Sequence, residues 1–433
     1  MAAINNKNTL KPEKTDIVLG FIPLTDCAPL VIAHEKGYFF NEGLNVTLSR
    51  ESSWAGIRDK VGLGILDGAQ MLASIPVASR LGVGGPKIDM ISAMVLDLNG
   101  NAITVNNDLY EHLFAVDPRS EFSPVIAAQT LQCVIEEHKR SKRPRLRFGL
   151  VHPCSTQNYE LRYWLASANI DPDRDIEIVV IPPPKMVSAM ADGDIHGFCV
   201  GEPWNTLAVQ QKLGHVVANK YQLWNNSPEK VFAVSEIWAN KNPATHQAIL
   251  RALIKSCIWL DKKENRKATA KIISQASYIA LPEETVALSL MGLSLKHFGQ
   301  PPEKVEDFHV FHRYSANFPW LNHGEWFISQ MYRWGQLTTP INIEETVAAV
   351  YKPSLFRIAA DAIGLESPSI DRKTEGNLHQ KNMLTKSQHI GPNQFLDGKV
   401  IHVGGIIKYL EQQNLSKADI PALRLFNSPK ETK

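Results

Sequence analysis

The chain has 433 residues, of which 44% are hydrophobic and 21% charged, and its 46 Lys and Arg against 44 Asp and Glu give a net charge of +2. This composition is typical of a folded protein and excludes an intrinsically disordered chain. A near-neutral chain has no overall field to hold nucleic acid or anionic lipid, so neither is expected as a direct partner. Because no stretch approaches the roughly 18 apolar residues of a membrane span, no membrane insertion is expected.

Short apolar strands alternate with helices through the first half of the chain. This alternation predicts sheets of parallel strands covered by helices, which is an α/β fold. The pattern predicts strands over 17–22, 44–48, 87–95, 146–151, 176–181 and 197–200, and helices over 28–36, from 53 onward, 159–168 and 185–191. The charged stretch between the third and fourth strands is expected to be irregular.

Beyond about residue 234 the pattern changes to helical periodicity, and after Ser367 it becomes polar, which favours an extended or partly disordered arm. Helices are expected over 244–263, 267–276, 283–295 and 343–362, with a short apolar element near 400–410. At roughly 150 residues per domain, the length fits two or three folding units. We therefore predict a first lobe begun by 16–104 and completed by the mostly helical 234–366, a second lobe over 105–233, and a C-terminal arm over 367–433.

The N-terminal residues and the cysteines favour the cytoplasm. The first sixteen residues are polar and lack the apolar core, roughly 7–15 residues long, of a secretory signal. Five cysteines without a close pairing motif suit a reducing compartment better than a disulfide framework. The alternative is an exported protein whose signal has been removed.

Catalytic motifs are incomplete in this sequence. There is no nucleophile elbow, no phosphate-binding P-loop and no dinucleotide-binding glycine motif. His34 and Glu35 begin a zinc-protease motif, but Tyr38 occupies the place of the second histidine. The aspartates of 171–175 lack the glycine and glutamate of a calcium loop and predict a turn instead. We therefore predict no enzyme, no metal and no cofactor. The basic run 138–147 lacks interleaved aromatic residues, which favours a solvated connector over an RNA site.

Four residues stand where predicted strands end and loops begin, the place at which open α/β sheets collect ligands. They are Trp54, Asn101, Gln157 and Lys230. Taken singly, they have ordinary explanations as a packing residue, a turn residue, a polar residue at a helix start and a surface charge. Together they offer four hydrogen-bond donors, which fits a ligand made of acceptors.

Several long segments resemble the nitrate- and bicarbonate-binding proteins of ABC importers (NrtA- and CmpA-like), which have the type II periplasmic-binding-protein fold. The resemblance runs from about Ile17 to Leu365 and is carried by LGFIPLTDCAPLVIAHEKGYF, SSWAGIRDKV, DGAQMLASIPVA, GFCVGEPWN and SPEKVFAV. Within this group, the chain is most similar to the cytoplasmic nitrate/nitrite sensors of the NasS type. This similarity rests on the segments NYELRYWLA, DPDRD and VIPPP and on the polar N-terminus.

The resemblance implies a two-lobed clamp that closes on a small planar anion. Carried over by position, the anion-binding residues are Trp54, Asn101, Gln157 and Lys230. Gln157 stands where the family usually has histidine, and a one-residue shift of the alignment would bring Thr156 into the site. The chain is expected to cross between the lobes near Thr104 and Ala233, which would be the hinges.

Nitrate offers only acceptor lone pairs, so its pocket is expected to present donors and to exclude bare carboxylates. Lys230 would supply a charge-assisted hydrogen bond, which is stronger than a neutral one. Bicarbonate carries a proton and would need an acceptor, with or without a metal. Glu202 is the candidate acceptor, although we interpret it as a structural residue near the lobe interface.

The function implied by the NasS-type resemblance is that of a nitrate/nitrite sensor. Such a sensor sequesters a NasT-like RNA-binding antiterminator with an ANTAR domain and releases it when the anion binds, which controls nitrate assimilation genes. The alternative is the solute-binding subunit of an ABC-type nitrate or bicarbonate importer. A third possibility is the binding domain of an importer ATPase, although no P-loop is present.

Overall fold

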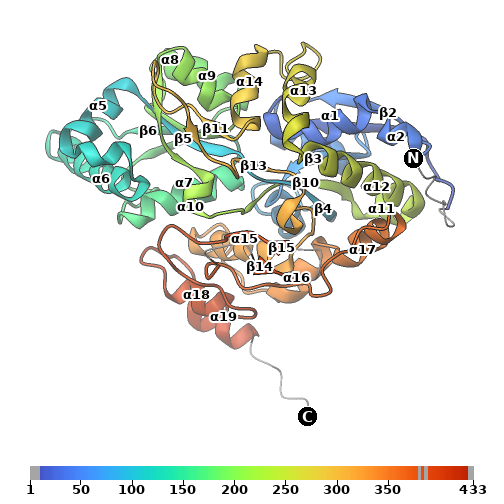
Figure 1. The fold of residues 1–433 in the computed structure, drawn as a ribbon. Helices are drawn as coiled ribbons and strands as arrows, with labels where there is room; N and C mark the ends of the chain where they lie inside the picture. The colour runs from blue at the N-terminus through green and yellow to red at the C-terminus, as the bar shows by residue number, and fades with distance from the viewer. Residues whose placement is uncertain (1–9, 379–381, 385–388, 428–433) are drawn as a thin grey trace.

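The computed structural model describes residues 10–378, 382–384 and 389–427. They form two α/β lobes, with the C-terminal helices packed below both lobes in the view of Figure 1. None of the helices in these ranges combines the length and apolar character that crossing a membrane requires.

The first lobe is built on a six-stranded sheet of order β13-β4-β10-β3-β1-β2. β1 runs parallel to β2 and β3, whereas β10 is antiparallel to β3 and β4, and β13 is antiparallel to β4. Its strands are β1 (Asp16–Phe21), β2 (Asn45–Arg50), β3 (Gly68–Leu72), β4 (Met90–Asn99), β10 (Pro228–Ser235) and β13 (His309–Val310). Its helices are α1 (Ala28–Glu35), α2 (Tyr38–Asn41), α3 (Trp54–Gly62), α4 (Ile75–Leu81), α11 (Glu236–Lys241), α12 (Pro243–Leu260), α13 (Lys263–Ile273) and α14 (Glu283–Leu290).

The second lobe is built on a five-stranded sheet of order β7-β6-β8-β5-β9. β6 is parallel to β7 and β8, and β5 is antiparallel to both β8 and β9. Its strands are β5 (Asn101–Asn106), β6 (Arg147–Leu150), β7 (Glu177–Val180), β8 (Gly197–Gly201) and β9 (Gly214–Asn219). Its helices are α5 (Asn107–Val116), α6 (Pro124–Arg140), α7 (Thr156–Ser167), α8 (Met186–Ala191), α9 (Trp204–Gln210) and α10 (Lys220–Leu223).

The α/β class is confirmed, but the expectation of purely parallel sheets is wrong. Each sheet contains a strand, β10 or β5, that adjoins a crossing between the lobes and runs antiparallel to both neighbours. The stretch expected to be irregular holds β5, α5 and α6. The helix expected over 343–362 is two helices, α16 (Ile343–Val350) and α17 (Pro353–Ala362), because proline lacks the N–H needed inside a helix and suits its first turn.

Both strand connections between the lobes pass through left-handed backbone. The first is Asn99 (φ 66°) and Gly100 (φ 91°), and the second contains Asn226 (φ 53°). A Cβ atom on Gly100 would stand 2.4 Å from the His309 ring, so only glycine fits there. Asn99 Nδ2 donates to Asn226 Oδ1 at 3.1 Å, and the Asn99 backbone N–H donates to the Ser227 carbonyl at 3.0 Å. The two connections are therefore held side by side.

The boundaries expected at Thr104 and Ala233 fall inside β5 and β10. Thr104 pairs with Phe198 and Ala233 pairs with Ala69, both in sheet ladders. A residue fixed in a ladder cannot absorb a hinge rotation, so the crossings at Gly100 and before β10 replace them as hinge candidates.

The C-terminal arm is packed against both lobes over its described residues, unlike the extended or disordered arm expected. It follows α15 (Leu321–Arg333), α16 and α17, and contains β14 (Asn382–Met383), β15 (His389–Ile390), α18 (Ile406–Glu411) and α19 (Ile420–Asn427). Phe395 stacks on Trp224 of the second lobe with ring centroids 4.7 Å apart. Tyr163 Oη donates to Asp397 Oδ1 at 2.5 Å, and the Lys417 backbone N–H donates to the carbonyl of Arg333 in α15 at 2.8 Å.

Two small hairpin-like pairs complete the described structure. β11 (Leu293–Ser294) pairs with β12 (Glu303–Lys304), and β14 pairs with β15. The segment after β11 also reaches the second lobe, where the Val216 backbone N–H donates to the Lys296 carbonyl at 3.1 Å.

Candidate functional site

A buried polar cluster lies where the two lobes meet, and we call it the interlobe cluster. The loop after β1, together with β4 and β10, supplies its residues from the first lobe, and β5, α7 and α10 supply those from the second. All of its side chains are buried. Its members are Asp26, Asp97, Asn101, Thr156, Gln157, Glu160, Lys220, Glu229 and Lys230.

Lys230 is completely buried and held between two carboxylates. Its Nζ lies 2.6 Å from Asp26 Oδ2 and 2.7 Å from Glu229 Oε1, and its backbone N–H donates to Asp97 Oδ1 at 3.0 Å. Burial disfavours the charged form, but the carboxylates outweigh burial and raise the pKa of Lys230 above its ordinary value. The ammonium charge is therefore kept at every physiological pH.

Glu229 is the residue on which the donors of the second lobe converge. Its Oε1 accepts from Thr156 Oγ1 and from Gln157 Nε2, each at 2.8 Å, and its Oε2 accepts from Asn101 Nδ2 at 2.8 Å. Gln157 Nε2 also donates to Asn101 Oδ1 at 3.0 Å. Burial would raise the pKa of Glu229, but Lys220 and Lys230 lower it to about 2, so this carboxylate stays ionised.

Lys220 joins a further carboxylate to the cluster. Its Nζ lies 2.7 Å from Glu160 Oε1, contacts Glu229 Oε2 and donates to the Pro228 carbonyl at 2.9 Å. Glu160 Oε2 accepts from Asn101 Nδ2 at 2.9 Å, which closes a ring of hydrogen bonds between the lobes. Burial raises the pKa of Glu160 despite Lys220.

An irregularity in β10 places Glu229 and Lys230 in the same cluster. Adjacent residues of a regular strand point to opposite faces of the sheet. The register of β10 against β4 shifts on both sides of Lys230, as in a β-bulge. Bulges redirect side chains in this way, so neighbours that a regular strand would separate can contact each other here.

The first turn of α7 presents Thr156 and Gln157 to Glu229. The helix starts there because Ser155 caps it, accepting the Asn158 backbone N–H at 2.9 Å on its Oγ. The positive end of the α7 dipole therefore faces the cluster and favours negative charge there.

Trp54 is brought to the cluster by the start of α3. Ser53 caps this helix by accepting the Gly56 backbone N–H at 3.2 Å, which leaves Trp54 as the first helical residue. The indole is fully buried, and its ring centroid lies 5.4 Å from Lys230 Nζ, within cation–π distance. Trp54 Nε1 has no hydrogen-bond partner within the part of the chain that the structure describes.

The structure thus brings Trp54, Asn101, Gln157 and Lys230 together from both lobes, with Thr156 beside them. The expectation that the pocket excludes bare carboxylates is wrong, because Asp26 and Glu229 contact Lys230 directly. Glu229 could have been found from the sequence, since it adjoins Lys230 and a buried lysine needs a counter-charge. No local pattern marks Asp26, which comes from a distant loop.

Glu202 lies at the lobe interface outside these contacts. Its carboxylate accepts the Thr206 backbone N–H in the first turn of α9 at 3.1 Å, and its carbonyl accepts the Thr25 backbone N–H of the other lobe at 2.8 Å. Burial raises the pKa of its carboxyl to about 7. These contacts give Glu202 a capping and bridging role.

The two lobes are closed over the cluster. Trp204 Nε1 of the second lobe donates to the Pro23 carbonyl of the first at 3.2 Å, and Ser74 Oγ donates to the Cys154 carbonyl across the same interface. Among the described residues, no group of three or more His, Cys, Asp or Glu is placed so that it could hold one metal ion.

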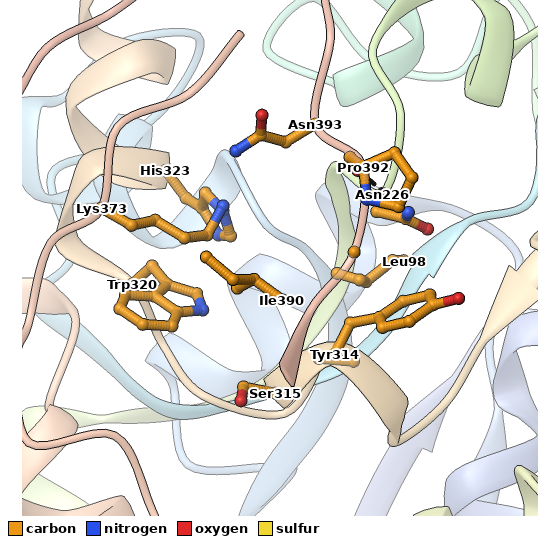
Figure 2. Close-up of a pocket in the computed structure, with 12 residues that line it drawn as sticks. Leu98, Asn226, Tyr314, Ser315, Trp320, His323, Lys373, Ile390, Pro392 and Asn393 are labelled. Atoms are coloured by element: carbon orange, nitrogen blue, oxygen red, sulfur yellow. Dashed lines mark hydrogen bonds between the residues drawn. The ribbon is translucent and has the colours of Figure 1, made fainter. Parts of the chain in front are cut away.

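A separate small cavity lies where the C-terminal arm covers the second crossing between the lobes. Figure 2 shows Trp320, His323 and Lys373 on one side of it and Asn226 and Pro392 on the other. Its volume is about 10 Å³, which is room for roughly one water molecule and not for a nitrate ion. This cavity is therefore too small to be the anion site.

Comparisons with known proteins place the chain in a family. Residues 10–274 match the NMT1-like family. The nitrate import ATP-binding protein NrtC of Synechocystis sp. is 40% identical over 354 residues, covering 81% of this chain and 51% of that protein, so the chain spans about half the length of this relative. The nitrate/nitrite binding protein NrtA of Nostoc sp. is 33% identical over 374 residues, covering 85% of this chain and 82% of that protein.

A solved structure agrees with these relatives. The crystal structure of the periplasmic nitrate-binding protein NrtA from Synechocystis PCC 6803 superposes with a TM-score of 0.80 and 27% identity, covering 94% of this chain and all of that one. The predicted periplasmic-binding-protein fold is confirmed. The chain belongs to the NMT1-like family and is related throughout both lobes to the nitrate/nitrite binding protein NrtA.

Proposed function

We propose that this chain binds nitrate or nitrite in the interlobe cluster, with Trp54, Asn101, Gln157 and Lys230 as the anion-binding residues. The observation that carries the proposal is the convergence, from both lobes, of a buried ammonium group, two amides and an indole N–H that has no hydrogen-bond partner among the described residues. This convergence occurs in a chain related to nitrate/nitrite binding proteins.

The donors suit an anion that has only acceptors. A buried N–H without a partner costs about 1–3 kcal/mol, and an anion oxygen at Trp54 Nε1 would remove that cost. Lys230 would supply the positive charge that an anion leaving water requires. The amide hydrogens of Asn101 and Gln157 now serve Glu229 and Glu160, so the anion has to compete with carboxylates for them.

Thr156 is a further donor in reach of the same position, since its hydroxyl already donates to Glu229 beside Gln157. The site needs no metal, no cofactor and no catalytic step in this proposal. Glu202 would become a ligand only if bicarbonate with a metal ion were the true ligand.

We further propose that binding serves a regulatory role in the cytoplasm. In this account the anion-free protein sequesters a NasT-like RNA-binding antiterminator with an ANTAR domain, and nitrate or nitrite releases it so that assimilation genes are expressed. Release requires that the anion bind the free protein better than the complex, by a coupling of about 1–3 kcal/mol. The sequence NYELRYWLA within α7 supports this sensor role, because it resembles the NasS-type sensors.

The importer role is the second candidate, and the relation to import proteins favours it. The chain is 40% identical to about half of NrtC and 33% identical to most of NrtA. It could accordingly act as the solute-binding subunit of an importer or as the binding part of a longer ATP-binding protein. Either importer role would use the same anion site and would not involve an antiterminator partner.

Calorimetric titration with nitrate, nitrite, bicarbonate and chloride tests the anion site. We expect nitrate or nitrite to bind and chloride not to bind, with and without a chelator. Binding of bicarbonate alone, lost in chelator and restored by calcium, would replace the nitrate proposal and give Glu202 a ligand role.

Co-purification with an ANTAR-domain antiterminator separates the two roles. The sensor account predicts a complex without anion that dissociates over the nitrate concentrations that saturate the site. A complex that persists at saturating nitrate and nitrite, or none at all, would contradict the sensor role and favour the importer.

A further inference from the structure

The ammonium group of Lys230 is already neutralised before any anion arrives. Two carboxylate oxygens stand within 2.7 Å of its Nζ. The whole cluster holds the carboxylates of Asp26, Asp97, Glu160 and Glu229 against the ammonium groups of Lys220 and Lys230. Its formal charge is therefore −2 when all six groups are ionised.

Another negative charge cannot be added to this cluster at low cost. Coulomb repulsion between like charges is strong where water is excluded, and all of these side chains are buried. The ammonium group of Lys230 donates two of its three hydrogens to Asp26 and Glu229, so an anion beside it would share the ammonium charge with two carboxylates. One carboxylate therefore has to lose its charge when the anion binds.

Glu229 is poorly suited to losing its charge by protonation. It accepts from two ammonium groups, two amides and the Thr156 hydroxyl, and all of these favour its ionised form. A proton on Glu229 would oppose five donors, so its pKa of about 2 is consistent with its contacts.

Asp26 is the carboxylate beside Lys230 that can lose its charge by taking up a proton. Its Oδ2 contacts Lys230 Nζ, and its Oδ1 accepts from Gln70 Nε2. The Gln70 amide is oriented by the Ile22 backbone N–H, which donates to Gln70 Oε1 at 3.0 Å. Oδ1 therefore keeps a fixed donor, whereas Oδ2 can take a proton once Lys230 Nζ donates to the anion instead.

The surroundings of Asp26 also favour its neutral form. Burial raises the pKa of Asp26 to about 7 in spite of Lys230, and the neighbouring carboxylates act in the same direction. His309 is buried and neutral, since burial lowers its pKa to about 3. The titratable and charged groups that face Asp26 are Cys27 beside it, Asp97 of β4, Glu229 and Lys230 of β10, and His309 of β13.

We propose that anion binding beside Lys230 is coupled to the uptake of about one proton by the Asp26 carboxylate, an inference that rests on the proposed function. A proton from solvent bonds to Asp26 Oδ2 and converts the carboxylate into a neutral acid. Lys230 then donates to the anion the hydrogen that Oδ2 had accepted. The new O–H of Asp26 is a further donor for the anion, and the total charge of the cluster is unchanged.

The direction of the pH dependence follows from this exchange. Above about pH 7 the anion-free protein carries an ionised Asp26, so each anion brings a proton with it and affinity falls about tenfold per pH unit. Below that range Asp26 is already protonated, and both the uptake and the pH dependence disappear.

Calorimetry with nitrate in buffers of different ionisation enthalpy measures the uptake directly. At pH 8, phosphate and Tris should give apparent enthalpies whose difference corresponds to about one proton per nitrate. Asp26→Asn imitates the neutral acid, since its carbonyl can face Gln70 and its NH₂ the anion. It should bind nitrate with no proton uptake and with an affinity that is constant from pH 7 to 9.

Asp67→Asn is the matched control, because Asp67 is also a buried aspartate paired with a lysine, at 2.6 Å from Lys14 Nζ, but it lies outside the interlobe cluster. We expect this variant to keep the uptake. Uptake lost in Asp67→Asn but retained in Asp26→Asn would overturn the assignment to Asp26.

If either variant fails to fold, nitrate binding by the wild-type protein still tests the inference. Nitrate binding without uptake at pH 8, or with the same affinity at pH 6.5 and 8.5, would overturn the coupling and leave the proposed function intact. Absence of any nitrate binding by the wild type would overturn the proposed function itself.

Discussion

Replacing Lys230 with alanine tests whether this lysine is as deeply paired as the structure shows. A lysine that acted only as an exposed ligand could be removed at little cost to folding. Lys230 instead has no exposed surface and contacts Asp26 and Glu229. Breaking a buried ion pair from one side costs about 3–5 kcal/mol, because the remaining charge stays buried without its partner. We expect Lys230→Ala to lower the free energy of unfolding by that amount.

Urea denaturation of a double-mutant cycle measures the pairing. Asp26→Asn removes the charge that Lys230→Ala leaves unpaired, so the double variant should recover more than about 1 kcal/mol of the sum of the single losses. Lys255→Ala is the control, since Lys255 contacts Glu42 at 2.6 Å but is 38% exposed. Such an exposed pair contributes about 0–1 kcal/mol. A loss for Lys230→Ala no greater than that for Lys255→Ala would refute the buried pairing.

Three further predictions follow from the site, the closure and the arm. Among the described residues, the indole N–H groups of Trp54 and Trp334 are both buried without a hydrogen-bond partner. Trp54→Phe should weaken nitrate binding about tenfold or more by calorimetry, whereas Trp334→Phe, outside the interlobe cluster, should not. Saturating nitrate should favour the closed lobes and lower the radius of gyration in small-angle scattering, and an unchanged scattering curve would count against closure as the response. Phe395→Ala should lower the free energy of unfolding by about 3–5 kcal/mol through loss of the buried stacking on Trp224. In contrast, Phe426→Ala should have little effect, because Phe426 is 53% exposed.

The sequence predicts the elements that have strong local signals. Gly37 follows α1 in left-handed backbone as its position suggests, and Ser53 caps α3 where a helix start is expected. The helical periodicity over 343–362 predicts one helix, whereas Pro353 begins a second helix at its first turn. Capping residues, glycine and proline therefore predict where α3 and α17 begin and where α1 ends.

Long-range features could not be predicted in the same way. The antiparallel placement of β5 and β10 depends on how the chain passes between the lobes, at Gly100 before β5 and at Asn226 before β10, and no strand pattern contains this information. The bulge beside Lys230 and its contact with Asp26 are likewise products of the assembled sheet. The resemblance predicts the donors of the candidate site, and the adjacency to Lys230 points to Glu229, whereas the contribution of Asp26 is visible only in the three-dimensional structure.

A crystal structure of the protein saturated with nitrate tests the central claim most directly. The account predicts a planar anion in the interlobe cluster, with oxygens within hydrogen-bond distance of Trp54 Nε1 and Lys230 Nζ, and with Asp26 Oδ2 bonded to the anion in place of Lys230 Nζ. Nitrate bound elsewhere, with the contacts among Asp26, Lys230 and Glu229 unchanged, would contradict it.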